Sequence, residues 1–295
     1  MDSYDIIFVG HVAIDQIVPY SGSEHSVQAG AVLYSAMAAT LSGKRLAVVT
    51  KMAEKDEYFL TPIRERGIAV YLLPSLVTTH MHVVYPTTNV DERQIFQKKS
   101  AGFFSINDLS AIEPCFAYLS GITNQEFTLE FMYELKERGF TLAVDMQSFI
   151  RQVDQKTNEI LMRDVWQKRD IFSMADKVKL DAVEARLLTG TDNLEEAAMR
   201  LEKNGATEIL ITRRDGVLAY HKSKTYFEKY SNRNSNGRTG RGDTTFGAYL
   251  AHRIDHSVVE SLTFATAIAS IKMETPGPFK GSLEDVLNRI KASHS

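Results

Sequence analysis

Short apolar segments alternate with longer helix-like segments along most of this chain, and that order strongly limits the folds open to it. Each apolar run has the length of a buried strand, and several helix-like segments end at a glycine, such as Gly43, Gly139 and Gly190. We expect strands at 4–10, 45–50, 68–73, 115–119, 141–145, near 175, at 208–212 and at 216–220. Strands that alternate with helices indicate an α/β fold, in which helices cover both faces of a mainly parallel sheet.

The expected helices lie between these strands. Small and apolar residues predict a tightly packed helix at 29–41, and a charged helix ends at Gly67. Further helices are expected at 126–138, 164–169, 181–188, 194–204 and 245–254. No repeat, low-complexity segment or proline-rich linker interrupts the pattern, so we expect residues 1–295 to form a single α/β domain.

The stretch 78–102 differs from the rest because its apolar and polar residues alternate. Its halves, 80–86 and 93–99, flank a polar turn at 87–92, which predicts a hairpin of partly exposed strands. We expect a small β lid formed by about 11–20 and 78–102, which covers a site or joins two subunits in a homodimer. His80 and His82 share one strand face and suggest a metal site, but no third ligand is evident nearby.

The composition is that of an ordinary globular protein and argues against several partners. Lysine plus arginine number 34 and aspartate plus glutamate 37, so a net charge of −3 favours neither nucleic acid nor an anionic membrane. The single cysteine, Cys115, excludes an internal disulfide framework. No run approaches the roughly 18 apolar residues of a membrane helix, and no signal peptide precedes the first strand. We therefore expect a cytoplasmic protein.

A glycine-rich stretch at 237–248 carries the clearest functional signal. Gly237, Gly240 and Gly242 free the backbone to aim several N–H groups at one point, and the helix that follows adds the positive end of its dipole. Such a loop binds anions, phosphate above all. Asp243 would repel that anion, which makes sense if its carboxylate takes a proton from a hydroxyl that attacks the phosphate. The alternative is a glycine loop with Asp243 as a plain N-cap.

Other polar residues stand at or after the predicted strands. Asp15 follows the first strand, while Lys179, Asp181 and Glu184 follow the strand near 175, and Thr212 closes the strand 208–212. Ligands of such sheets bind beyond the carboxyl ends of the strands. Together with the glycine loop, these residues predict one site along a single edge of the sheet.

In this order the clusters resemble the ribokinase/PfkB family of small-molecule kinases. The run 239–244 (Thr-Gly-Arg-Gly-Asp-Thr) is similar to the C-terminal signature of that family, and 212–216 resembles its nucleotide-side strand and glycine turn. Residues 181–184 match its Asn-x-x-Glu helix start, with Asp181 in place of the asparagine. The resemblance spans nearly the whole chain and implies a ribokinase-like fold and an ATP-dependent kinase.

Departures from the family pattern point to one branch of it. The paired glycine before the substrate helix is Ala29-Gly30 here, and the asparagine that touches substrate falls on Tyr34. The runs 237–243 and 272–278 look like the bacterial myo-inositol kinase branch. Among small polyols, sugars and cyclitols, the resemblance therefore implies myo-inositol as the leading candidate for the acceptor.

The resemblance also implies a role for each site residue. Asp243 would be the general base, and the backbone N–H groups of Gly240, Arg241 and Gly242 would stabilise the phosphoryl oxygens. Glu184 would hold Mg²⁺, directly or through water. The acceptor would contact Asp15, Gly30, Tyr34, Gln147 and Asp243. ATP would lie along Lys179, Asp181, Thr212, Gly216, Thr239 and Met273, with the apolar stretch 264–273 of the last helix beside adenine.

Two other functions remain open at this stage. A nucleoside or sugar-phosphate kinase of the same family is the nearest, since Arg93, Lys98 and Lys99 near the lid are available to a phosphorylated sugar. The other is a nucleotide-binding regulator that has lost catalysis, although the presence of Asp243 and of the glycine loop argues against it.

Overall fold

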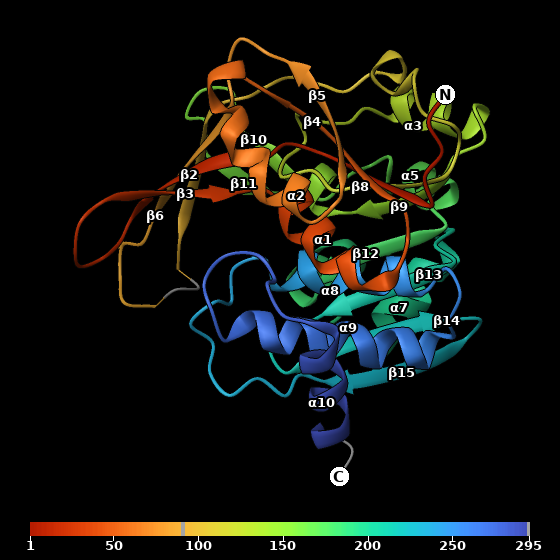
Figure 1. Ribbon diagram of the computed structural model, residues 1–295. Coiled ribbons are helices and arrows are strands. Elements are labelled where there is room, and N and C mark those ends of the chain that lie inside the picture. Colours follow the sequence, from red (N-terminus) through yellow and green to blue (C-terminus); the bar gives the residue numbers. More distant parts are fainter. Residues whose placement is uncertain (90–91, 294–295) are drawn as a thin grey trace.

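The computed structural model describes residues 1–89 and 92–293, and a large, mainly parallel sheet forms its centre (Figure 1). Among the described residues this main sheet has nine strands. From the bottom of the view upward they are β15 (Lys224–Lys229), β14 (Gly216–His221), β13 (Glu208–Thr212), β12 (Lys177–Asp181), β9 (Thr141–Asp145), β8 (Phe116–Leu119), β1 (Ile6–Val9), β4 (Leu46–Met52) and β5 (Ala69–Pro74). Only the β13–β14 and β14–β15 pairs are antiparallel within this set, so the predicted fold class is confirmed.

Helices cover both faces of the main sheet, as the sequence predicts. One face carries α1 (Ala31–Ala39), α2 (Thr61–Glu65), α8 (Arg241–His252), α9 (Val258–Met273) and α10 (Leu283–Ser293). The other carries α3 (Leu129–Glu137), α5 (Lys168–Met174), α6 (Ala182–Thr189) and α7 (Leu194–Lys203). Alternate strand residues serve the two cores: in β1, Ile6 and Phe8 face the first layer, and Ile7 and Val9 face the second. None of the helices that the structure describes is long and apolar enough to cross a membrane.

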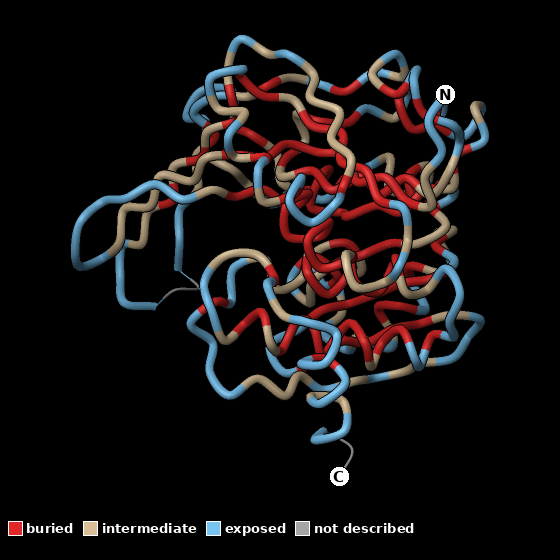
Figure 2. The backbone as a smooth tube through the Cα atoms, viewed as in Figure 1, coloured by how far each residue is buried: buried red, intermediate tan, exposed pale blue. Residues whose placement is uncertain are grey.

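A separate small sheet projects to the left of the main sheet in Figure 1. Its strand order is β3 (His25–Ala29), β2 (Ala13–Val18), β6 (Thr79–Val84) and β7 (Gln94–Lys99), and it contains both segments predicted to form the lid. Figure 2 shows the contrast in burial: the inner strands of the main sheet are mostly buried, whereas its edge strands β5 and β15 and most of the small sheet are intermediate or exposed. The polar turn predicted at 87–92 includes residues 90 and 91, which lie outside the described residues.

Several sequence-based expectations were wrong in detail. The apolar run 171–175 is the end of α5 rather than a strand, and the strand is β12, which itself contains Lys179 and Asp181. The helix expected at 245–254 begins four residues earlier, at Arg241, so that Asp243 lies in its first turn. The stretch 264–273 belongs to α9 and is followed by α10. Four strands and two helices were not predicted: β3, β15, the hairpin β10 (Arg151–Val153) with β11 (Ile160–Met162), the short helix α4 (Gln147–Ile150), and α10.

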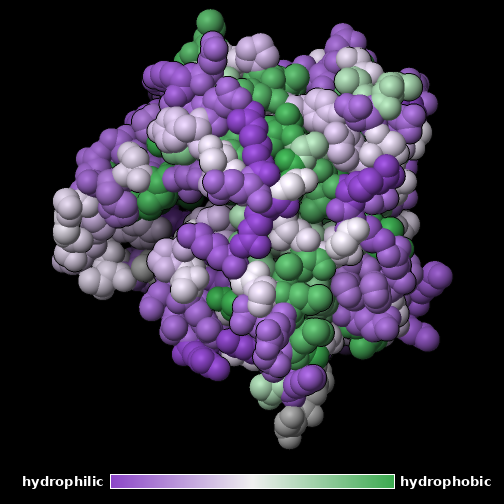
Figure 3. Space-filling model, viewed as in Figure 1, coloured by the Kyte–Doolittle hydropathy of each residue, from purple (hydrophilic) through white to green (hydrophobic). Residues whose placement is uncertain are grey.

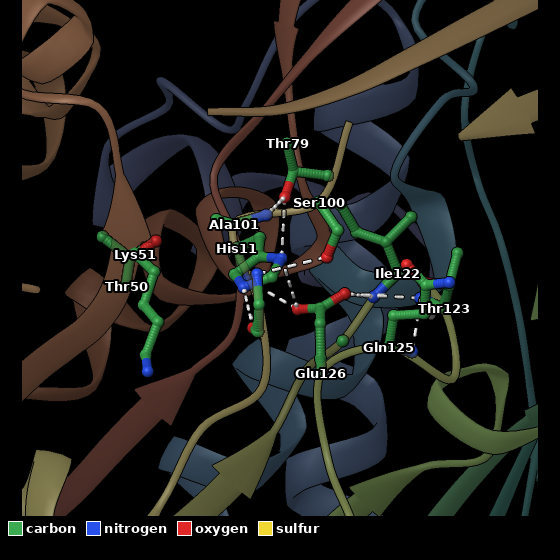
Figure 4. A network of polar contacts seen from close by, with 12 residues as sticks. His11, Thr50, Lys51, Thr79, Ser100, Ala101, Ile122, Thr123, Gln125 and Glu126 are labelled. Carbon is green, nitrogen blue, oxygen red and sulfur yellow. Dashed lines mark hydrogen bonds and ion pairs between the residues drawn. The ribbon is translucent and has the colours of Figure 1, made fainter. Parts of the chain in front are cut away.

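A buried polar network joins the base of the small sheet to the main sheet (Figure 4). The Glu126 carboxylate, 1% exposed, accepts the backbone N–H of His11 at 2.8 Å and those of Ile122 and Thr123 at 2.5 and 3.3 Å. Since Nε2 of His11 faces the carbonyl of Gly102 at 3.0 Å, it carries the proton, and Nδ1 accepts from the Thr79 hydroxyl at 2.8 Å. Burial lowers the pKa of His11, which keeps the ring in this neutral form. The network fixes where the small sheet leaves the main sheet.

We expect Glu126→Ala to lower the free energy of unfolding by more than about 2 kcal/mol, because several buried N–H groups lose a charged acceptor. Glu126→Gln keeps one acceptor oxygen and should lose less. Urea unfolding midpoints would measure both. The matched control is Glu137→Ala, which removes an exposed carboxylate at the end of α3 and should change stability by less than about 0.5 kcal/mol. Equal effects for Glu126→Ala and the control would contradict this role.

Candidate functional site

A cavity of about 830 Å³ lies between the small sheet and the carboxyl ends of the main-sheet strands. Asp181 and Thr212, the last residues of β12 and β13, line it, as expected for a ligand site of such a sheet. The small sheet contributes Asp15 and Val83, and the loop 236–240 with the first turn of α8 forms the facing wall. In Figure 3 the surface is hollowed between the small sheet on the left and the rest of the molecule.

The glycine loop reaches this cavity because its glycines permit very close packing. Gly240, the N-cap of α8, has φ 76°, and a Cβ there would lie 2.4 Å from the ring of Tyr34. A Cβ on Gly242 would lie 3.0 Å from Cε of Lys179. The N–H groups of Gly242 and Asp243 occupy the second and third positions of the helix, where no intrahelical acceptor exists. The N–H of Arg241 already donates to the carbonyl of Arg238 at 3.1 Å.

Asp243 lies in the cavity wall with one oxygen that no protein group satisfies. Within the described residues, its buried Oδ1 has no hydrogen-bond partner. The side chain is 16% exposed, and the same oxygen lies 3.9 Å from Nζ of Lys179. A carboxylate that is unsatisfied in a cavity and close to a fixed cation is available to accept a proton from a bound hydroxyl.

Lys179 is a fixed cation beneath the first turn of α8. Its ammonium group donates to Asp145 at 2.8 Å, and both side chains are almost completely buried. Burial by itself lowers the pKa of Lys179, but the carboxylates of Asp145, Glu184 and Asp243 together raise it above its ordinary value. The lysine is therefore charged at neutral pH, directly under Gly242.

The residues predicted to contact the acceptor also line this cavity, but not all in the expected way. Burial raises the pKa of the Asp15 carboxyl to about 6, and Arg93 opposes that rise. Gln147 donates its side-chain N–H to the carbonyl of Gly121 at 2.8 Å. The ring of Tyr34 is packed against Gly240 and lies 4.9 Å from the ammonium of Lys272, so less of it is open to an acceptor than expected.

Three predicted site residues lie outside the cavity lining. Gly216 faces Phe227 and the carbonyl of Glu228, and Met273 is 2% exposed within the core. Glu184 is fully buried and closes a capping box, in which it accepts the N–H of Asp181 at 2.8 Å. Burial, with help from Asp181, raises the pKa of Glu184 to about 7, and its Oε1 lies 3.5 Å from Arg151. Since Glu184 does not line the cavity, a direct metal contact there has no support in this geometry.

The structure also brings in residues that the sequence analysis did not assign. Arg151 lines the cavity and faces Glu184 at 3.5 Å, and Asp145 holds Lys179. Arg238 and Lys272 belong to the same wall as the glycine loop. For Lys272 a signal existed: it is a cation at the end of the otherwise apolar stretch 264–273. For Arg151 and Asp145 only the fold could show the proximity.

Comparisons with known proteins agree with this architecture. The pfkB family of carbohydrate kinases matches residues 5–285. The chain is 28% identical over 257 residues to a cytidine kinase from Thermococcus kodakarensis (strain ATCC BAA-918 / JCM 12380 / KOD1), covering 84% of this chain and 87% of the relative.

Two solved structures of pyrophosphate-dependent kinases in the ribokinase family are similar over nearly all of both chains. A sulfate complex gives a TM-score of 0.88 at 30% identity, with 96% of this chain and 99% of the other covered. A complex with a pyrophosphate analogue and myo-inositol gives 0.87 at 29% identity, with the same coverage. The match over residues 5–285 and the shared fold show that this chain belongs to the pfkB family of carbohydrate kinases.

Proposed function

We propose that this protein transfers a phosphoryl group to a hydroxyl of a small uncharged polyol, with Asp243 as the general base. The observation that carries the proposal is the unsatisfied Oδ1 of Asp243 in the wall of the cavity, at the start of α8. The hydroxyl oxygen attacks the terminal phosphorus, the bond to the leaving phosphate breaks, and Asp243 receives the hydroxyl proton. A regulator without activity would not need a carboxylate beside its anion site.

The anion site supplies charge stabilisation from several directions. The N–H groups of Gly242 and Asp243 and the positive end of α8 face the transferring phosphoryl group. Lys179 adds a fixed positive charge beneath Gly242, and Arg241 lines the same wall, its guanidinium 5.7 Å from the ring centroid of Tyr230. Since the transition state of phosphoryl transfer is loose, positioning and charge matter more than the strength of the base.

Magnesium fits this arrangement as a partner of the donor rather than of a protein cage. No group of three or more histidine, cysteine, aspartate or glutamate side chains that could hold a metal occurs in the part of the chain that the structure describes. Mg²⁺ in such enzymes usually takes one or two carboxylates plus phosphate oxygens and water. Asp181, which lines the cavity, is the carboxylate we assign to it. The bound ion would neutralise charge on the donor phosphates.

For the acceptor we propose myo-inositol, in agreement with the solved relative whose complex contains it. Of the three lid cations that a sugar phosphate would need, Lys98 and Lys99 lie outside the cavity lining and only Arg93 belongs to it. That arrangement argues against a phosphorylated acceptor. The cytidine kinase relative keeps a nucleoside as the second candidate, since the apolar wall of the small sheet could pack against a base.

For the donor we propose inorganic pyrophosphate in place of the ATP that the sequence resemblance implies. Two of the residues expected on the nucleotide side, Gly216 and Met273, lie outside the cavity. The wall that remains is dense in positive charge, with Lys179, Arg241 and Lys272 around the anion loop. Such a site recognises phosphates without requiring a base. The two solved structures of pyrophosphate-dependent kinases support the same choice.

We expect Asp243→Asn to lower kcat by about 10²–10⁴-fold while the affinity for pyrophosphate changes little, because asparagine keeps the shape but cannot accept the proton. Initial rates and calorimetric titration would measure the two effects. Asp170→Asn, a substitution on α5 away from the cavity lining, is the matched control and should keep the wild-type rate. A variant at position 243 with half of the wild-type rate would refute the assignment of the base.

A screen of donors and acceptors tests the substrate proposal. Pyrophosphate and ATP would each be combined with myo-inositol, ribose, cytidine and fructose 6-phosphate at constant free Mg²⁺, and product would be followed by ³¹P NMR. We expect the highest kcat/KM for pyrophosphate with myo-inositol. Strong turnover only with cytidine would show that the acceptor is a nucleoside, and strong turnover only with ATP would restore the nucleotide as donor.

A further inference from the structure

Lys272 is a buried cation to which the donor site above gives no role beyond its positive charge. It lies in the last turn of α9, is 2% exposed, and reaches the cavity wall. Its ammonium group donates to the carbonyl oxygens of both Gly237 and Thr239. Among the described residues no carboxylate lies within ion-pair distance of it, in contrast to Lys179, which is paired with Asp145. Burying a cation without a counter-ion costs free energy. The position of Lys272 is therefore explained if a bound anion, rather than a carboxylate of the protein, balances its charge.

The two carbonyls belong to the loop that carries the anion site. Gly237 is otherwise held by its N–H, which donates to the carbonyl of Met273 at 2.8 Å, and a Cβ there would clash with the carbonyl of Thr275. Lys272 therefore connects the loop to the end of α9 through two carbonyl oxygens of the loop. With these oxygens held, the N–H groups at the start of α8 remain directed to the cavity.

We propose that Lys272 is a positioning residue of the donor site: it holds the carbonyls of Gly237 and Thr239 and supplies positive charge that the bound phosphate donor neutralises. The proposal rests on the phosphate-donor function proposed above. It assigns to a residue of α9 a part in donor binding, while the acceptor side of the cavity should be unaffected.

The charge of Lys272 is sensitive to pH in the range where such enzymes are assayed. Burial lowers its pKa to about 8, and Asp243 on α8 opposes that change. Of the other neighbouring groups, Tyr34 on α1 is neutral, with its own pKa raised to about 12 by burial and by Asp15 and Asp243. Arg238 and Arg241 are cations of the same wall, and Glu274 is paired with Arg289 at 2.8 Å. A bound phosphate favours the protonated lysine, so donor binding near pH 8 should take up a proton.

Calorimetric titration of magnesium pyrophosphate at pH 8, in buffers of different ionisation enthalpy, measures this proton uptake directly. A group with a pKa near the working pH is half protonated, so the wild type should take up about half a proton more than Lys272→Met. The same variant should bind pyrophosphate about thirtyfold or more weakly at pH 7, while KM for the acceptor stays close to the wild-type value. Lys177→Met is the control: it neutralises a partly buried lysine beside Glu208, away from the cavity, and should leave pyrophosphate affinity unchanged.

A rescue experiment separates charge from folding. Lys272→Ala leaves a space beside two carbonyl oxygens, so ammonium or methylammonium ions should restore pyrophosphate binding to the variant and leave the wild type unaffected. If Lys272→Ala binds pyrophosphate as tightly as the wild type, or if wild type and Lys272→Met take up the same number of protons, the role of Lys272 is refuted. If the wild type binds neither pyrophosphate nor ATP, the proposed donor function itself fails.

Discussion

The close approach of α8 to α1 determines where the anion loop lies, and the rest of the site depends on it. Gly247 makes this approach possible, since a Cβ at that position would lie 2.3 Å from the carbonyl oxygen of Ser35. Gly240 repeats the same contact at the start of the helix, against the ring of Tyr34. The helix is thereby held with its N-terminus over the ends of β12 and β13, and the residues that carry its unpaired N–H groups line the cavity. A larger side chain at either glycine would displace the whole anion site and not only its own turn.

Some charged side chains in and beneath the cavity are paired with a protein group of opposite charge, and others are not. Lys179 has a buried partner in Asp145, and Arg151 faces the buried Glu184, so these cations are balanced within the protein. Asp243 keeps one oxygen without a hydrogen bond, and Lys272 holds only backbone carbonyls. The paired side chains hold fixed positions in the site. The unpaired side chains are the ones available to interact with a ligand. Whether a charged side chain is paired therefore distinguishes structural from functional residues better than its position in the sequence does.

Much of the fold was predictable because its strands and helices are local patterns. The strand at 141–145 and the one at 208–212 were predicted at their observed bounds, and the glycine loop identified Asp243 and its surroundings. The strand near 175 was misplaced because an apolar run of five residues fits a buried helix as well as a buried strand. Gly216 lies outside the cavity because Phe227 and Glu228 of β15 lie against it, and β15 is a polar edge strand without a clear sequence signal. Met273 is buried at the end of α9, and an apolar stretch does not by itself tell a cavity wall from core. Asp145 and Arg151 join the site only through the tertiary fold.

The register of the small sheet decides which surface the acceptor meets. Ile17, Met81, Val83 and Ile95 are apolar residues of the small sheet that line the cavity beside the polar Asp15 and His25, and Val83 lies opposite Ile95 in the β6–β7 pair. The intervening residues His80, His82 and Lys98 are outside the cavity lining. Because side chains alternate along a strand, a shift of one residue would exchange the two sets and place imidazoles and an ammonium group over the acceptor. An apolar wall excludes water from a transfer that water would otherwise intercept, whereas a wall of cations would bind a second anion there. The alternation that made 78–102 conspicuous in the sequence therefore produces the apolar residues on which the proposal of a neutral acceptor rests.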